Sequence, residues 1–412
     1  MRILHTADWH LGKRLDSHSR FEEQIEVMHE ISTIAQEQEV DLVIVAGDLF
    51  DTFNPPTDAI ELLYKTLNQL ARNATVPVIA IAGNHDSPSR IDSADVLARL
   101  NGIIFVGEPQ ADLGTYTLDD SFTVTRSDHG FIEIKLPHIQ HPVRVLHTPY
   151  ANEVRLKEYF EADKQEELQE SLRTKWEELA QRYCDANGYN LLTTHLFVAQ
   201  RGKQLPDEPD GEKPLNIGGA DIIYSDIIPP QIQYAALGHL HRYQNVGTHQ
   251  PVIYSGSTLQ YSFSEAGQQK YVILIDFDKD NPTTEPELSK IPLTQGKPLH
   301  RKTFDDIDLA VQWLQENPYA LVELTIESET FITAEERRRL AQAHEGIVHI
   351  IPKITGQQMV ASQSANSANI SKDMKGLFTD YFKMRNDGQN PSEEILSLFD
   401  EVTAHTSDDE TQ

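Results

Sequence analysis

The sequence predicts an α/β fold for residues 1–277. Two observations lead to this prediction. Short runs of almost uninterrupted apolar residues recur along this part of the chain, and stretches with helical apolar spacing lie between the first of them. Strands that are covered on both faces are apolar throughout, whereas half-exposed strands alternate apolar and polar residues. The alternation of such strands with helices is typical of an α/β core.

The first predicted elements follow one another in regular order. Buried strands are expected at Arg2–His5, Asp41–Ala46, Val76–Ala82 and Tyr189–Thr194. Helices are expected at Ser19–Glu39 and Thr57–Ala74, where apolar residues recur every three to four positions. Another helix is expected to begin at Pro88, because proline suits the first helical position and Ser87 precedes it.

A second group of strands is expected in the middle of the chain. Gly130–Leu136 and Val143–Thr148 alternate in polarity and predict a hairpin, and Asn152–Ala186 is a long, charged, amphipathic helical stretch. Arg201–Gly219 is rich in proline, glycine and charge, which predicts a loop. The remaining strands of this group are expected at Tyr234–Gly238, Val252–Ser255 and Lys270–Phe277.

Several domains are expected beyond residue 277, because Asp278–Pro286 carries two prolines and resembles a boundary. Residues 278–355 predict a small α+β domain, 356–369 a polar linker, 370–404 a helix–loop–helix and 405–412 an acidic tail. The small domain is expected to contain the helices Ile307–Glu316 and Ala334–Ala343 and the strands Ala320–Ile326 and Ile347–Pro352.

The composition limits the classes of function. The net charge is −29, from 35 basic and 64 acidic residues, which argues against nucleic-acid binding by overall charge. The chain has one cysteine, so an intramolecular disulfide cannot form, as suits a reducing compartment. The first residues lack a signal pattern and no long apolar run occurs, so a cytoplasmic protein without a membrane segment is expected.

Polar residues follow five of the predicted strands. They are Asp8, His10, Asp48, Asn84, His195, His239 and His241. Gly47, Gly83 and Gly238 stand between strand and polar residue in three of the five places, and glycine permits a close backbone approach. Side chains at the carboxyl ends of strands in an open α/β sheet converge on one crevice. We therefore expect these seven residues to meet.

The residue types indicate a metal centre. Oxygen and nitrogen donors without thiolate suit manganese, iron or zinc better than calcium or magnesium alone. Seven donors are more than one ion needs, whereas two ions that share a bridging carboxylate account for all of them. Two metals at roughly 3.5–4 Å hold the attacking and leaving oxygens of a phosphoryl displacement.

Each motif has an ordinary explanation when taken alone. D-x-H arises often by chance, Gly-Asp is usually a turn, and a histidine at a strand end is usually hydrogen-bonded. Their joint occurrence, in order and each at a strand end, favours the metal centre. Five basic residues near these motifs are candidates for phosphate contacts, with ordinary surface charge equally possible: Lys13, Arg14, Arg90, Arg201 and Arg242.

The ordered set D-x-H, G-D-x-x-D, G-N-H-D, H and G-H-x-H resembles the calcineurin-like metallophosphoesterase superfamily. The longer segments HTADWHLGKRL, VAGDLFDTFNPP, AGNHDSPSR and ALGHLHRYQ are more narrowly similar to the SbcD family, the bacterial branch of the double-strand-break repair nucleases. The resemblance implies a four-layer α/β/β/α metallophosphoesterase sandwich, a small α+β capping domain and a C-terminal helical hairpin.

The resemblance also implies a role for each site residue. One metal is expected on Asp8, His10, Asp48 and His241, and the other on Asp48, Asn84, His195 and His239. Asp48 then bridges two divalent ions, expected to be manganese. His85 is implied as a catalytic group that acts on the leaving oxygen. Asp86 is expected to orient His85, and Asp51 to support the ligands.

The implied function is manganese-dependent cleavage of DNA, as exonuclease and endonuclease, in end processing, repair, recombination and replication. Two alternatives stay open at this point. The same metal site serves phosphatases and cyclic-nucleotide phosphodiesterases. A non-catalytic subunit that retains the fold is the second alternative.

The C-terminal helices carry apolar stripes at helical spacing. The stripes contain Leu377, Phe378, Tyr381 and Phe382, and then Ile395, Leu398 and Phe399. A hairpin this short buries too little surface to be stable alone, so docking on a partner is favoured over packing on the body of the chain. The resemblance implies the coiled-coil base of an SbcC-like SMC-family ATPase as that partner, with a possible homodimer within a heterotetramer on DNA.

Overall fold

The structure is a computed structural model that describes residues 1–119, 121–158, 164–206, 208 and 222–354. Beyond these it describes only residues 378–379, 382, 391–392 and 395–396. Two large sheets form the main body. The six-stranded first sheet has the order β18 (Glu287–Pro292), β17 (Tyr271–Asp276), β1 (Arg2–Thr6), β4 (Leu42–Ala46), β5 (Val78–Ile81) and β6 (Ile103–Val106). From β1 to β6 the strands are parallel.

The second sheet has eight strands. Its order is β15 (Gln244–Asn245), β16 (Val252–Tyr254), β14 (Tyr234–Gly238), β11 (Tyr189–His195), β10 (Val143–Thr148), β9 (Phe131–Lys135), β8 (Thr123–Asp128) and β7 (Tyr116–Thr117). The strands β16, β14, β11 and β10 are parallel, and β9 and β10 form the predicted hairpin. Two of these strands, β10 and β14, have the predicted bounds, and the ends of β9, β11 and β16 differ from the prediction by one residue. The short strands β7 and β15 and the strand β8 were not predicted.

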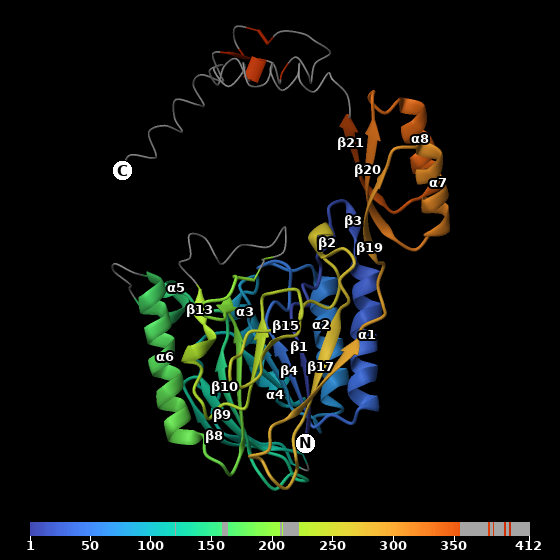
Figure 1. Cartoon of the computed structure of the whole chain (residues 1–412). Coiled ribbons are helices and arrows are strands. Elements are labelled where there is room, and N and C mark those ends of the chain that lie inside the picture. Colours follow the sequence, from blue (N-terminus) through green and yellow to red (C-terminus); the bar gives the residue numbers. More distant parts are fainter. Residues whose placement is uncertain are drawn as a thin grey trace.

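The two sheets pack face to face, and helices cover their outer faces. Ile44 of β4 and Val145 of β10 belong to the apolar layer between the sheets. The helices α1 (Phe21–Glu37) and α2 (Thr57–Ala71) cover the first sheet, and α6 (Lys164–Tyr183) covers the second with Trp176. Figure 1 shows α1 and α2 on one side of the body and α6 on the other. The predicted four-layer sandwich is confirmed.

Buried strands and amphipathic helices explain this arrangement. Every residue of β4, β5 and β14 is buried, as strands between a helix layer and another sheet require. In α1, Val27, Ile31 and Ile34 recur on the buried face, while Glu22, Glu26 and Glu37 are exposed. The helical stretch predicted over 152–186 is divided, because Lys157 adopts a left-handed conformation (φ 57°) that ends α5 (Glu153–Leu156) before α6 begins.

A third sheet follows the main body. Its strands are β19 (Leu299–Phe304), β20 (Leu321–Ser328) and β21 (Ile347–Ile354). The helices α7 (Ile307–Glu316) and α8 (Ala334–Ala343) lie between them in the sequence. All three strands are parallel, so this unit is α/β rather than the predicted α+β, and its first strand is an addition. Parallel neighbours require a crossover, which α7 and α8 supply. The predicted boundary at residue 278 also moves towards the C-terminus, because β18 pairs with β17 in the first sheet.

A small apolar cluster joins the third sheet to the body. The body contributes Leu15, from the ribbon of β2 (Arg14–Leu15) and β3 (His18–Ser19), and Phe263, from the 3₁₀ turn η2 (Phe263–Glu265). Both side chains pack with Leu299 and Leu321 of the third sheet. No helix among the described residues is long and apolar enough to span a membrane. Most of the predicted C-terminal hairpin, including Leu377, Tyr381, Leu398 and Phe399, lies outside the described residues.

Candidate metal centre

The predicted ligands lie at the carboxyl ends of strands from both large sheets. Asp8 and His10 follow β1, Asp48 follows β4, Asn84 follows β5, His195 ends β11, and His239 and His241 follow β14. All but Asn84 are buried, and Asn84 is half-buried. Packing the sheets face to face therefore brings residues that are far apart in the sequence to one place.

Several ligand positions have an unusual backbone conformation. Asp8 (φ 52°), His10 (φ 44°), Asp48 (φ 47°) and His239 (φ 104°) all have positive φ, which is uncommon for residues other than glycine. Hydrogen bonds between the loops hold them there. Asp8 N donates to Gly47 O (3.1 Å), and His239 N donates to Asp8 Oδ1 (2.8 Å). Positive φ at several neighbouring positions is characteristic of functional sites.

Two of the glycines are required by a close approach of the strands' ends. A Cβ at Gly47 would lie 2.2 Å from His195 Nδ1, and a Cβ at Gly83 would lie 2.0 Å from Asp48 Oδ1. Neither place can hold a side chain. The close approach predicted from glycine at these positions is therefore confirmed.

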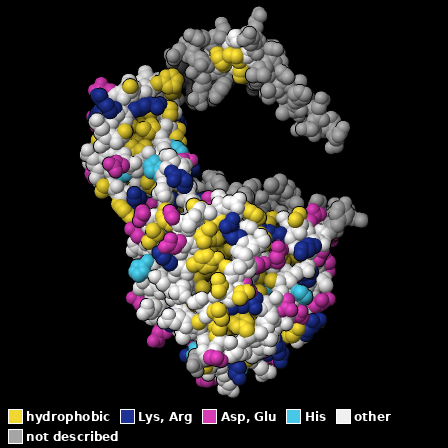
Figure 2. Space-filling model, turned by 180° about the vertical axis from the view of Figure 1, so that it is seen from behind, with side chains coloured by type: hydrophobic (Ala, Val, Ile, Leu, Met, Phe, Trp, Pro, Cys, Tyr) yellow, Lys and Arg dark blue, Asp and Glu magenta, His cyan; other side chains and the backbone are white. Residues whose placement is uncertain are grey.

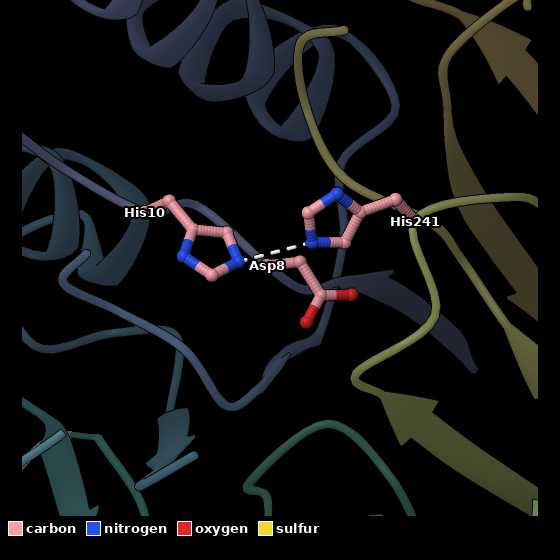
Figure 3. A group of neighbouring side chains, drawn as sticks. All are labelled: Asp8, His10 and His241. Carbon is pink, nitrogen blue, oxygen red and sulfur yellow. Dashed lines mark hydrogen bonds between the residues drawn. The ribbon is translucent and has the colours of Figure 1, made fainter. Parts of the chain in front are cut away.

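The first group of converging atoms contains Asp8, His10 and His241, whose potential ligand atoms lie within 4.8 Å of one another. His10 Nε2 and His241 Nε2 face each other at 3.0 Å beside the Asp8 carboxylate (Figure 3). Asp8 Oδ2 is buried and has no hydrogen-bond partner among the described residues. A buried carboxylate oxygen without a partner is costly, and a cation would compensate it. The donor set therefore fits a divalent metal.

A second group contains Asp8, Asp48 and His195. His195 Nε2 lies 2.9 Å from Asn84 Oδ1 and 3.2 Å from Asp48 Oδ2. The same Asp48 oxygen lies 3.6 Å from His10 Nε2, so it stands between the two groups. The other oxygen, Asp48 Oδ1, accepts a hydrogen bond from His85 N (2.9 Å). Asp48 thus lies near histidine nitrogens of both groups, and Asp8 belongs to both.

His239 is less directly placed. Its ring centroid lies 5.6 Å from that of His195, but its Nε2 atom contacts Glu208 Oε1 at 2.9 Å. Among the described residues, His239 does not belong to any group whose ligand atoms converge within 4.8 Å. The structure therefore places His239 beside the second group with a carboxylate at its Nε2 atom.

His85 is buried beside the first group, with its ring 4.9 Å from that of His10. His85 Nδ1 donates to the carbonyl oxygen of Asp51 (2.6 Å), which leaves Nε2 as the atom that can exchange a proton. Asp86 does not orient this ring, contrary to the prediction. Its carboxylate accepts from the backbone N–H groups of Leu49 (3.0 Å), Phe50 (2.9 Å) and Gly83 (2.8 Å) and so fixes the loops.

Arg155 was not predicted but supports the same loop. Its guanidinium donates to the carbonyl oxygens of Gly83 (2.9 Å) and Asp86 (2.9 Å), on either side of Asn84 and His85. No local sequence signal identifies such a residue, because it lies in α5, far along the chain. Glu265 and Lys270, next to His241, were also missed, although Ser262-x-x-Glu265 has the spacing of a capping box.

The basic candidates divide into two sets. Lys13 and Arg14 line a cleft of about 500 Å³ with His85 and residues of the third sheet, and Arg242 lines a second cleft beside His241. Arg90 is exposed and hydrogen-bonded to Asn54, and Arg201 pairs with Asp226 (2.7 Å). Acidic and basic side chains are interspersed on the face shown in Figure 2. Of the five candidates, Lys13, Arg14 and Arg242 lie beside the centre, whereas Arg90 and Arg201 are engaged elsewhere.

The charges of the metal-free centre depend on one another. Burial opposes the charge on His195, but Asp48 and Asp8 outweigh it and raise its pKa to about 9. Burial raises the pKa of Asp8 to about 6. For Asp48, His195 outweighs burial and holds the pKa well below its usual value. A proton on His195 therefore occupies the place that a metal would take.

Metal affinity should depend on pH as a result. At every pH below about 9, a metal must displace the proton from His195, so apparent Mn²⁺ affinity should rise with pH. The expected slope is about tenfold per pH unit between about pH 6.5 and 8.5 for one displaced proton. Titration calorimetry at a series of pH values measures it. An affinity that does not change with pH would contradict this assignment.

Gly83→Ala tests the steric requirement at Asp48. The new Cβ would force the Asp48 carboxylate to move, so Mn²⁺ affinity should fall by at least about tenfold while the fold persists. Gly114→Ala is the matched control, since Gly114 (φ +66°) has nothing within 4 Å of its would-be Cβ. The control should cost about 1 kcal/mol of stability and leave metal binding unchanged. Equal metal affinity in both variants would refute the steric argument.

Comparisons with known proteins identify the family of the chain. A family model described as calcineurin-like phosphoesterase matches residues 1–243. SbcD of Bacillus subtilis (strain 168), a component of the SbcCD nuclease, is 32% identical over 421 aligned residues, which cover 100% of each chain. The solved structure of TT1561 of Thermus thermophilus covers 71% of this chain and 99% of its own, at 12% identity and a TM-score of 0.35. On the first two findings, the chain belongs to the calcineurin-like phosphoesterase family, in the branch that contains the SbcD component of the SbcCD nuclease.

Proposed function

We propose that this chain is a metal-dependent DNA nuclease subunit that hydrolyses phosphodiester bonds as an exonuclease and an endonuclease. The observation that carries the proposal is the position of Asp48 Oδ2, 3.6 Å from His10 Nε2 and 3.2 Å from His195 Nε2. One carboxylate between two groups of donors fits a pair of divalent ions, for which manganese is our choice. The name of the Bacillus subtilis relative supports DNA as the substrate.

The proposed ligands follow the two groups. One ion would be held by Asp8, His10, Asp48 and His241, and the other by Asp48, Asn84, His195 and His239. Glu208 would then give up its contact with His239 Nε2. Such a pair supplies a water of lowered pKa and neutralises charge on the phosphate. His85 would donate a proton from Nε2 to the leaving oxygen, while the Asp51 carbonyl keeps the proton on Nδ1.

DNA would enter through the cleft beside His85. Lys13, Arg14, Arg301 and His349 line this cleft, the last two from the third sheet. Lys13 is paired with Asp51 at 2.9 Å, so its charge is partly used within the protein. With a net charge of −29, this local set would have to provide the phosphate contacts, and a basic partner would strengthen binding.

A nuclease assay with and without Mn²⁺, on single-stranded DNA and on p-nitrophenyl phosphate, tests the proposal. The wild-type chain should cleave the DNA, whereas a small-molecule phosphatase would hydrolyse p-nitrophenyl phosphate faster. Asp48→Ala should lose both ions and all cleavage, because the bridging ligand is shared, while the melting transition persists. Two equivalents of bound manganese in Asp48→Ala would refute the bridging role.

His85→Ala separates catalysis from metal binding. We expect two bound ions and nearly normal DNA binding, because the proposed ligands are intact. Cleavage should slow by roughly 10²–10⁴-fold, as expected on loss of a general acid. Single-turnover cleavage rates and metal analysis of the same sample measure both effects. Loss of metal in this variant would show that His85 is itself a ligand.

We further propose that the C-terminal hairpin binds an SbcC-like SMC-family ATPase in a cytoplasmic complex, with two copies of each chain. Phe378 and Phe382, which are among the described residues, contact each other with ring centroids 6.1 Å apart. Leu377, Tyr381, Ile395, Leu398 and Phe399 complete the proposed contact set. Apolar and aromatic anchors of this kind dominate helix-in-groove interfaces.

Truncation after Ile354 tests this part. The fragment keeps every proposed ligand and both main sheets, so it should melt as the full chain does and cleave single-stranded DNA. It should fail to co-purify with the ATPase, and Phe378→Glu with Phe399→Glu should reproduce that loss at full length. If the fragment instead melts lower and still binds the ATPase, the hairpin belongs to the body of the chain.

A further inference from the structure

The side chain of His241 is held by a buried carboxylate. Its Nδ1 atom lies 3.2 Å from Glu265 Oε1, and both side chains are 2% exposed. The glutamate lies beyond position 243, where the match to the family model ends. Glu265 therefore lies outside the matched residues, and it touches one proposed ligand directly.

Glu265 is itself fixed by several donors. Its Oε1 atom accepts from the backbone N–H groups of Tyr261 (3.1 Å) and Ser262 (3.1 Å), the second of which belongs to the capping box of η2. Its Oε2 atom accepts from Ser257 Oγ (3.2 Å) and from the ammonium of Lys270 (2.5 Å). Backbone N–H groups and an ammonium can only donate, so both oxygens of Glu265 act as acceptors. The carboxylate is therefore ionised and immobile.

The contact determines which nitrogen of His241 carries the proton. An ionised carboxylate can only accept hydrogen bonds, so His241 Nδ1 must donate. The lone pair then lies on Nε2, the atom that faces His10 Nε2 at 3.0 Å in Figure 3. Lys270 also donates to the carbonyl oxygen of His241 (2.7 Å), so the backbone of the ligand is held by the same pair.

The neighbouring ligand His195 is held differently. Its Nδ1 atom donates to the carbonyl oxygen of Ala46 (2.9 Å), a neutral acceptor. A carboxylate makes the imidazole it binds a stronger electron donor than a carbonyl does. Of these two histidines, His241 is therefore the stronger donor.

We propose that Glu265 and Lys270 are a positioning pair that fixes His241 as an Nε2 ligand and makes its metal site the tighter of the two. This inference rests on the proposed two-metal function. It concerns residues that touch a ligand and not the substrate. Lys270 neutralises Glu265, so the carboxylate stays in the interior without adding net charge.

The first test uses the unmodified protein without metal. Long-range ¹H–¹⁵N spectra of ¹⁵N-histidine-labelled chain distinguish the two tautomers, and comparison with His241→Asn assigns the signals. The Nδ1–H tautomer is expected for His241. An Nε2–H tautomer would overturn the proposal. Since no metal is present, this result does not depend on whether the proposed nuclease function is right.

The second test is Mn²⁺ titration of Glu265→Gln, with Glu133→Gln as the matched control. Glu133 forms an ion pair of similar burial with Arg144 (2.9 Å), on strands that carry no ligand. In Glu265→Gln the tighter of two binding steps should weaken by about 10–100-fold, and the other by less than about threefold. The control should lower the melting temperature and change neither step. Equal weakening of both steps, or unchanged binding in Glu265→Gln, would overturn the proposal.

Discussion

The Asp48 carboxylate is the feature on which the rest of the centre depends. It is fully buried, so its charge must be compensated by neighbours that are held in place. The backbone of His85 supplies a donor at one oxygen, and His10 and His195 flank the other. These residues come from three loops and two sheets. The face-to-face packing of the sheets therefore has to be accurate, since a shift at either sheet would leave a buried charge without its partners.

The loops achieve this accuracy at a conformational cost. Asp8, Asp48 and His239 have positive φ, a backbone conformation of the kind that costs of order 1–3 kcal/mol at each position. Such conformations persist only where surrounding contacts determine them. The Asp8 N–H bond to Gly47 O and the His239 N–H bond to Asp8 Oδ1 hold two of them. The carboxylate of Asp86, with three backbone donors, holds the loop after Asp48, and the guanidinium of Arg155 holds the loop of Gly83. Residues that never approach a substrate thus decide where the ligands lie.

Much of this centre could be predicted, because ligands at the ends of parallel strands leave a local pattern of apolar run, glycine and polar residue. The supporting residues leave none. Arg155 reaches its loop across 72 positions of sequence, and Glu265 differs from other glutamates only by its turn. The strand β19, with His300, Arg301 and Lys302 in six residues, lacks the apolar run of a buried strand and was missed for that reason. Asp86 was assigned to the wrong neighbour because adjacency in sequence does not give the direction of a side chain.

The turn η2 connects the metal centre with the third sheet. Phe263, its first residue, packs with Leu299 and Leu321 of that sheet, and Glu265, its last residue, holds His241. The two contacts are thus made from the same three-residue turn. The Gln260 side chain adds a second tie, because its Oε1 atom accepts from Leu299 N (2.7 Å). The turn that holds one proposed ligand is therefore also a surface on which the third sheet rests, although that sheet contributes none of the proposed ligands.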